Sequence, residues 1–160
     1  MNITDQEVYH GTVCLKIIKQ LENLGYKKGI KFLSGTSKNS LIIESEDGKH
    51  IGLYIKYTKK NYSPWAFSFH IEHQEEIKIL NEICVEAFVA FVCGRDGIPL
   101  ITYQELKNLL DEYFEENERV SISRKPNGNY WLKGRDGKLE QSVTVSDLGK
   151  KILEKINLNQ

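Results

Sequence analysis

The sequence of 160 residues predicts a mixed α/β fold, in which a central mixed β-sheet is flanked by helices. Two apolar runs, Leu41–Glu44 and Ile51–Tyr57, flank Asp47-Gly48, a dipeptide typical of hairpin turns. Both runs are apolar on successive residues, which is typical of strands covered on both faces. Segments with helical periodicity alternate with strand segments along the rest of the chain. We therefore expect a single domain over residues 1–160, long enough to bury a substantial core.

Four helices are expected where apolar residues recur three and four positions apart. Capping boxes beginning at Thr4 and at Thr102 mark the start of the first and third helices. Gly25 follows the first helix as a left-handed cap. Acidic residues occupy the first turns of the second helix, where the helix dipole stabilises them. In chain order the helices are expected over 5–24, from 72 to about 81, from 102 to 114, and from 146 towards the C-terminus.

Strands are expected where apolar residues alternate with polar ones or run without interruption. The segment 65–70 alternates, which predicts a half-buried strand, and Pro64 before it interrupts strand pairing. The continuous apolar run 87–93 predicts a buried strand, and residues 126–129 (PNGN) mark the turn of a second hairpin. In chain order the strands are expected around 30–33, 41–44, 51–57, 65–70, 87–93, 98–101, 120–124 and 130–133.

Lys56 interrupts an otherwise apolar strand, and a lysine at such a position must reach water or serve chemistry. If Asp47-Gly48 forms a two-residue type I′ turn, the numbers of cross-strand partners sum to 95. Asn39 is then expected opposite Lys56, with Leu41 beside Tyr54.

Charge is balanced overall but unevenly distributed. Lysine plus arginine and aspartate plus glutamate both number 22, yet segments 10–70 and 120–160 are basic while 71–119 is acidic, which permits one positive face. Cys14, Cys84 and Cys93 lie among apolar residues without metal-finger spacing, which predicts reduced thiols in a cytoplasmic protein. No segment approaches membrane-spanning length, so neither secretion nor membrane insertion is expected.

The order helix, three strands, helix, strand resembles the core of the PD-(D/E)XK nuclease superfamily, over roughly residues 5–95. In that family one strand begins with a metal-binding aspartate and the next carries Glu-x-Lys, and SLIIESEDGKHIGLYIK is similar to this segment. Lys56 matches the lysine, Tyr54 stands at the glutamate position, and Ser40 or Asn39 stands at the aspartate position. The resemblance implies a restriction-endonuclease-like core, here extended by a C-terminal hairpin and helix.

The resemblance also implies a candidate catalytic centre. Phosphodiester hydrolysis of this kind needs carboxylates that hold Mg²⁺ or Mn²⁺ and a lysine that neutralises developing charge. Some restriction endonucleases are similar in carrying Ser-x-Lys in the strand and the glutamate on the following helix. On that pattern Lys56 and Glu72 are the candidate catalytic residues, whereas His70 and His73 lack a third ligand and are assigned a capping or surface role. The candidate ligands for Mg²⁺ or Mn²⁺ are Glu72, Glu75 and Glu76.

Two basic-aromatic clusters, one within residues 56–65 and the other within 124–135, predict that the partner is nucleic acid, with DNA favoured over RNA. Cations neutralise phosphates, and aromatic rings stack on unpaired bases. The candidate binding residues are Lys59, Lys60, Trp65, Arg124, Lys125, Lys133 and Arg135. The chain is thus expected to be a nucleic-acid-binding protein of nuclease-like fold, either a divergent Mg/Mn-dependent nuclease or an inactive relative. The alternative is a non-catalytic regulatory domain that docks a protein partner through the acidic middle segment, 71–119.

Overall fold

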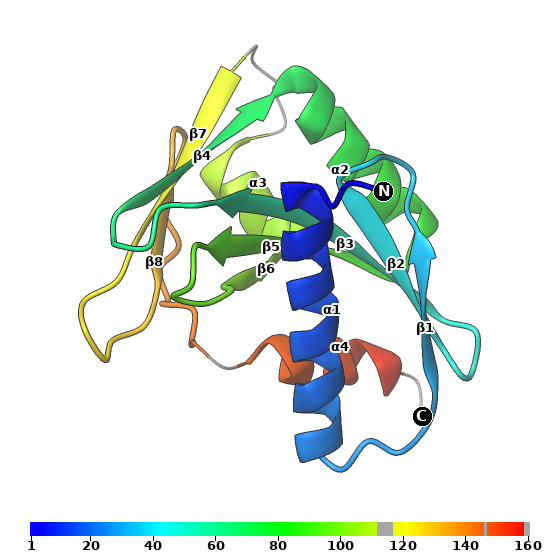
Figure 1. Cartoon of the computed structure of the whole chain (residues 1–160). Coiled ribbons are helices and arrows are strands. Elements are labelled where there is room, and N and C mark those ends of the chain that lie inside the picture. Colours follow the sequence, from blue (N-terminus) through cyan, green and yellow to red (C-terminus); the bar gives the residue numbers. More distant parts are fainter. Residues whose placement is uncertain (112–116, 146, 159–160) are drawn as a thin grey trace.

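The computed structural model describes residues 1–111, 117–145 and 147–158 (Figure 1). In chain order the elements are α1 (Asp5–Asn23), β1 (Ile30–Ser34), β2 (Ser40–Ser45), β3 (His50–Thr58), β4 (Trp65–His70), α2 (Ile71–Ile83), β5 (Glu86–Cys93), β6 (Leu100–Thr102), α3 (Tyr103–Leu109), β7 (Asn117–Ser123), β8 (Trp131–Gly134) and α4 (Leu148–Ile156). The helical and strand segments predicted from periodicity are therefore present. Helix α3 ends at Leu109, earlier than predicted, because Leu110 already has an extended backbone. The part of that helix expected over 112–114 and the start expected for the last helix at residue 146 lie outside the described residues.

The central sheet has the strand order β1-β2-β3-β5-β6. Strands β3 and β5 are parallel and the other neighbours are antiparallel, so the sheet is mixed, as predicted. The uninterrupted apolar run of β5 supplies both faces of this sheet, since Phe88 and Val92 belong to one core cluster and Val89 and Phe91 to the other.

Helices cover both faces of the central sheet. Helices α1 and α4 pack on one face, where Ile17 and Ile152 are fully buried in the same cluster. The opposite face is covered by α2 and α3, which contribute Leu80 and Leu106. The expected mixed α/β class, with helices on both sides of a mixed sheet, is confirmed.

The turn of the first hairpin differs from the prediction. Ser40 lies opposite Tyr54 and Glu44 opposite His50, so partner numbers sum to 94 rather than 95. The loop has three residues, and its last one, Gly48, has a φ of +84°. This is the type I turn with a left-handed glycine that three-residue hairpins favour, because a glycine tolerates positive φ. Asn39 therefore lies opposite Ile55, whose N–H donates to the Asn39 carbonyl at 2.8 Å, and not opposite Lys56.

Strand β4 leaves the central sheet, which the sequence reasoning did not anticipate. It pairs with β7, and β7 pairs with β8, to form a second sheet of order β4-β7-β8. The alternation seen in the sequence explains the arrangement: Trp65, Phe67 and Phe69 are buried and lie opposite Ile122, Val120 and Glu118. The inner face of this sheet thereby completes the core on the side of α2 and α3.

A close approach between β3 and α2 fixes the geometry around Tyr54. A Cβ atom at Gly52 would lie 2.6 Å from Cγ of Leu80, so only a glycine lets α2 pack this tightly on the strand. The helix then runs past the buried Tyr54, two residues along β3.

Within the described residues, no helix combines the length and hydrophobicity needed to cross a bilayer. Cys14, Cys84 and Cys93 are free thiols, and burial raises the pKa of each. The cytoplasmic location inferred from them stays a prediction.

Candidate functional site

A chain of polar side chains crosses from α1 to α2 at the position where the sequence resemblance places the nuclease centre. The side chain of Gln6 in α1 donates to Oδ1 of Asn39 at 3.2 Å, and Nδ2 of Asn39 donates to the hydroxyl of Tyr54 at 3.3 Å. Tyr54 in turn donates to Oε2 of Glu76 at 2.6 Å. This hydrogen-bonded network contains one carboxylate, that of Glu76 in α2, and three neutral side chains.

Tyr54 is the pivot of this network. Its side chain is fully buried, and burial together with the neighbouring Glu76 carboxylate raises the pKa of its hydroxyl well above the ordinary value. The hydroxyl therefore stays protonated. It donates a hydrogen bond to Glu76 and accepts one from Asn39. The charge-assisted bond to a carboxylate is the stronger of the two.

Lys56 lies two residues further along the same strand and is half-buried. Its Nζ atom is 3.2 Å from Nδ1 of His73 and 4.9 Å from the ring centre of Phe69. Burial lowers the pKa of Lys56 to about 8, and the Glu76 carboxylate partly opposes that effect. Such a lysine can hold an anion or exchange a proton near neutral pH.

His73 is held as a neutral imidazole. Its Nδ1 atom accepts the backbone N–H of His70 at 3.3 Å, which requires that Nδ1 carry no proton. Burial, and then the charge of Lys56, lower the pKa of His73 below its ordinary value. The contact of His73 with His70, at the start of α2, agrees with the capping role predicted from the sequence.

The three glutamates predicted to serve Lys56 lie in different surroundings. Glu76 bonds to Tyr54 and acts electrostatically on Lys56, whereas Glu72 and Glu75 are exposed on α2. Sequence reasoning missed Gln6, which it saw only as part of a capping box, and gave Asn39 the wrong cross-strand neighbour. The roles of Glu72, Glu75 and Glu76 as metal ligands stay predictions.

The side chains of the network do not fit a Mg²⁺ or Mn²⁺ centre of the kind the family resemblance implies. These ions bind through several oxygen ligands, usually carboxylates. Here Glu76 is the one carboxylate of the network and already accepts from Tyr54, and the amide oxygen of Asn39 already accepts from Gln6. A separate acidic group exists elsewhere in the described residues, with carboxylate oxygens within 4.8 Å of one another: Asp111, Glu118 and Asp136.

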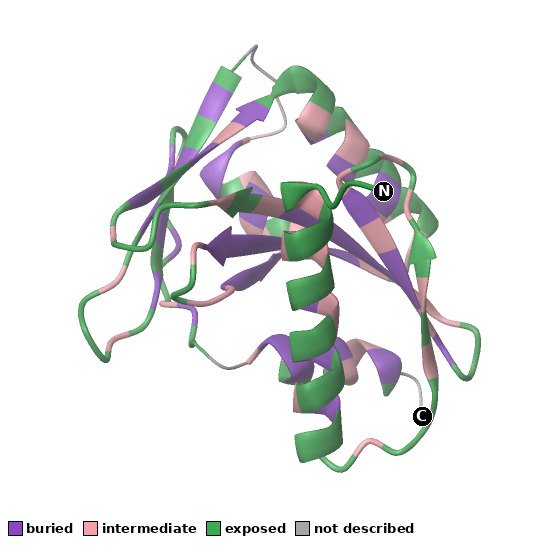
Figure 2. Cartoon of the chain, in the orientation of Figure 1, coloured by how far each residue is buried: buried purple, intermediate pink, exposed green. Residues whose placement is uncertain are grey.

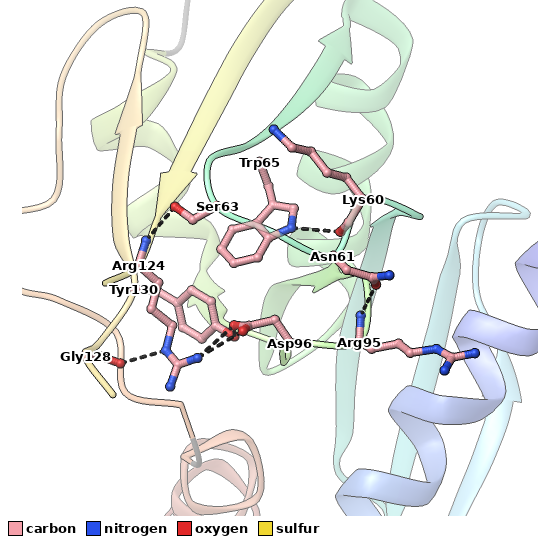
Figure 3. Close-up of polar contacts among 9 residues, drawn as sticks. All are labelled: Lys60, Asn61, Ser63, Trp65, Arg95, Asp96, Arg124, Gly128 and Tyr130. Atoms are coloured by element: carbon pink, nitrogen blue, oxygen red, sulfur yellow. Dashed lines mark hydrogen bonds and ion pairs between the residues drawn. The ribbon is translucent and has the colours of Figure 1, made fainter. Parts of the chain in front are cut away.

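The structure brings together the two basic-aromatic clusters that are 60 residues apart in the sequence (Figure 3). The backbone N–H of Arg124 donates to Oγ of Ser63 at 3.0 Å, and the rings of Trp65 and Tyr130 are 6.0 Å apart. Trp65 is only 2% exposed, and its Nε1 donates to the carbonyl of Lys60 at 2.8 Å. Its indole is part of the core, with no exposed face for a base.

Several of the candidate nucleic-acid-binding cations already have protein partners. Arg124 bonds to the Asp96 carboxylate at 3.0 Å and to the carbonyl of Gly128 at 2.7 Å (Figure 3). Lys59 pairs with Asp5 at 2.7 Å, and Lys60 donates to the carbonyl of Pro64 at 2.6 Å. Three of the candidate cations are exposed: Lys125, Lys133 and Arg135.

Comparison with known proteins gives one informative result. No protein-family model and no curated protein sequence matches the chain. Its structure is similar to the 1.6 Å structure of Hjc, a Holliday junction resolvase from the archaeal hyperthermophile Archaeoglobus fulgidus, with a TM-score of 0.50 and 14% sequence identity. The match covers 78% of this chain and 90% of that chain. The chain has a restriction-endonuclease-like fold.

The nuclease-like fold confirms the architecture that the sequence resemblance implies. The polar network lies where the sequence resemblance places the signature residues. The sequence resemblance aligned Tyr54 and Lys56 with the glutamate and lysine of the signature, and Asn39 or Ser40 with the aspartate. Of these, Asn39, Tyr54 and Lys56 lie together beside Glu76.

Proposed function

We propose that this chain is a nucleic-acid-binding protein in which the nuclease centre of the fold does not hydrolyse phosphodiester bonds. The observation that carries the proposal is the set of groups around Lys56. The lysine is kept, but the position aligned with the glutamate holds Tyr54 and the position aligned with the aspartate holds Asn39 or Ser40. The carboxylate of the nearby Glu76 accepts a hydrogen bond from the tyrosine. A metal-activated water requires the carboxylates that these residues replace.

Nucleic acid is the partner supported by the fold and by the distribution of charge. The structural neighbour is by its name a resolvase of Holliday junctions, which are DNA, and DNA is favoured over RNA on that ground. The two basic-aromatic segments meet in the fold, and Lys125 and Lys133 are exposed there. Exposed cations of this kind bind phosphates and release counterions.

The test is to measure binding and cleavage on the same substrates. Fluorescence anisotropy with duplex, branched and single-stranded DNA and RNA should show binding that weakens as salt rises. Incubation with Mg²⁺ or Mn²⁺ should leave all substrates intact. Cleavage that disappears in Lys56→Ala and in Glu76→Gln would show that the centre is active, whereas cleavage that survives both would point to a contaminant. Absence of salt-dependent binding to every substrate would reject the nucleic-acid function itself.

A further inference from the structure

The second sheet exposes its outer face to solvent. Its three strands alternate buried and exposed residues, visible as alternating bands on β7 in Figure 2. Phe67, Val120 and Leu132 point inwards and are at most 3% exposed. The alternate side chains of each strand therefore form a solvent-facing surface.

That surface contains no carboxylate. In β4, β7 and β8, all of whose residues are described, the one acidic residue is Glu118, which is 1% exposed and lies on the inner face. The exposed side chains include two cations, Arg119 of β7 and Lys133 of β8. A chain with equal numbers of acidic and basic residues thus presents a strand surface of one sign. A polyanion would meet attraction there without repulsion from the sheet itself.

The cations are separated by small residues. In the strand register, Ala66, Ser121 and Lys133 form one row across the sheet, and Ser68 lies beside Arg119. Because these side chains are small, they leave room between the long cationic side chains for an extended nucleic-acid strand to lie on the sheet. The segment after β8 adds Lys138, whose backbone pairs with Lys133 in an isolated β-bridge, and two exposed acids, Asp136 and Glu140.

One end of this face is hollowed and aromatic. An open depression of about 340 Å³ is lined by residues that include Ser63, Ser123, Lys125 and Trp131. Trp131 is 53% exposed, in contrast to Trp65 in the core, and its cross-strand neighbour is the small Ser123. An exposed indole ring beside an exposed lysine is the pairing that stacks an unpaired base and contacts its phosphate.

We propose that the outer face of the β4-β7-β8 sheet binds single-stranded nucleic acid, with a base stacked on Trp131 and phosphates contacted by Lys125, Lys133 and Arg119. This inference rests on the proposed nucleic-acid function and assigns it a surface and a substrate class. The single strand is specified because a base can stack on Trp131 only when it is unpaired. A duplex offers its phosphates to the cations but no base face to the indole.

Trp131 also supplies the readout. The chain has two tryptophans, and Trp65 is buried, so stacking should quench the fluorescence of Trp131 alone. We would titrate the full chain with oligo-dT and oligo-U and with a duplex of the same length. Single strands should quench the emission and bind more tightly than the duplex. Trp131→Ala should weaken single-strand binding about tenfold, and Trp131→Phe should stay close to the native chain because it keeps an aromatic face.

The electrostatic part is tested by a matched pair of double variants. Arg119→Gln/Lys133→Gln should reduce the slope of log K against log salt by about 1.4, because each phosphate contact on a single strand contributes about 0.7. Lys27→Gln/Lys28→Gln removes the same charge from exposed residues between α1 and β1 and should leave the slope unchanged. Thermal melts of each variant establish that it is folded.

The possible failures are distinguishable. If the native chain binds but Trp131→Ala and Arg119→Gln/Lys133→Gln bind equally well, the outer face of the β4-β7-β8 sheet is not the binding surface. The proposed function would still stand. Equal affinity for duplex and single strand, with no change in Trp131 emission, likewise overturns the stacking role. If the native chain binds no nucleic acid at low salt, the proposed function fails and this inference fails with it.

Discussion

Replacing Lys56 with methionine should stabilise the protein at neutral pH. Burial lowers the pKa of Lys56 from its ordinary value of 10.5 to about 8. Because one pKa unit corresponds to about 1.4 kcal/mol, the charged lysine costs the fold about 3 kcal/mol at pH 7 relative to an exposed lysine. Methionine has a similar length and no charge, but it loses the contacts with His73 and the Phe69 ring, worth about 1 kcal/mol each. The expected net gain is about 1 kcal/mol.

The pH dependence of that gain follows from the direction of the shift. Between pH 8 and 10.5 the unfolded chain holds a proton on Lys56 that the folded chain has released, so this residue makes stability rise with pH in that window. Lys56→Met lacks the effect, and its advantage over the native chain should therefore shrink towards pH 10.5. Urea unfolding of both proteins across this range measures the difference, in which the other titrating groups largely cancel.

The matched control is Lys19→Met, at an exposed position of α1, which should give a flat difference curve. A Lys56→Met variant that is less stable than the native chain at every pH would refute the reasoning. It would mean that the contacts of Lys56 outweigh the cost of burying its charge.

Two glycines offer further tests of the fold around this centre. Gly48→Val should destabilise by roughly 1–3 kcal/mol in urea unfolding because a β-branched residue resists the φ of +84°, whereas Gly29→Val, in open space, should be nearly neutral. Equal losses in the two would contradict the three-residue turn. Gly52→Ala should cost roughly 1–3 kcal/mol because its Cβ would lie 2.6 Å from Leu80, while Gly11→Ala, exposed within α1, should gain roughly 0.5–1 kcal/mol. A neutral Gly52→Ala melt would mean that α2 is free to move away from β3.

Local patterns predicted most of the elements, and pairing across distance explains what they left out. The apolar run of β5 indicated a strand buried on both faces, and it lies inside the sheet, between β3 and β6. Asp47-Gly48 is compatible with both a two-residue and a three-residue loop, and the choice decided which residue faces Tyr54. The partner of β4 is β7, about fifty residues later, and no local signal specifies such a pairing.

The candidate functional residues illustrate the same limit. The family resemblance implied the positions of Tyr54 and Lys56, whereas Gln6 reaches the centre from α1, where its local pattern indicated only a helix start. The two basic-aromatic clusters were visible in the sequence, but their tryptophans differ in burial. Trp65 is in the core and Trp131 is exposed, a distinction that depends on which face of the second sheet each occupies.

The neutral side chains beside Tyr54 suggest one last experiment, which asks whether this centre tolerates a second carboxylate. In Asn39→Asp, the new carboxylate and that of Glu76 would flank the Tyr54 hydroxyl, no more than about 6 Å apart given the present contacts. At an effective dielectric constant of about 20, their repulsion is about 3 kcal/mol, and the charge of Lys56 offsets part of it. Tyr54 would also lose the donor that Asn39 supplies.

Asn39→Ala is the matched control, because it removes the same hydrogen bond without adding charge. We expect Asn39→Asp to be less stable than Asn39→Ala by about 1–2 kcal/mol at pH 7. Repulsion raises the pKa of the new carboxyl group in the folded state, so its penalty should fade as the pH drops and the group takes up a proton. Urea unfolding between pH 7 and 4 would follow the two variants as they converge. If Asn39→Asp matches the native chain at pH 7, the centre accommodates the pair of carboxylates that a metal-dependent nuclease needs, and the proposed lack of cleavage would then have to arise from Tyr54 alone.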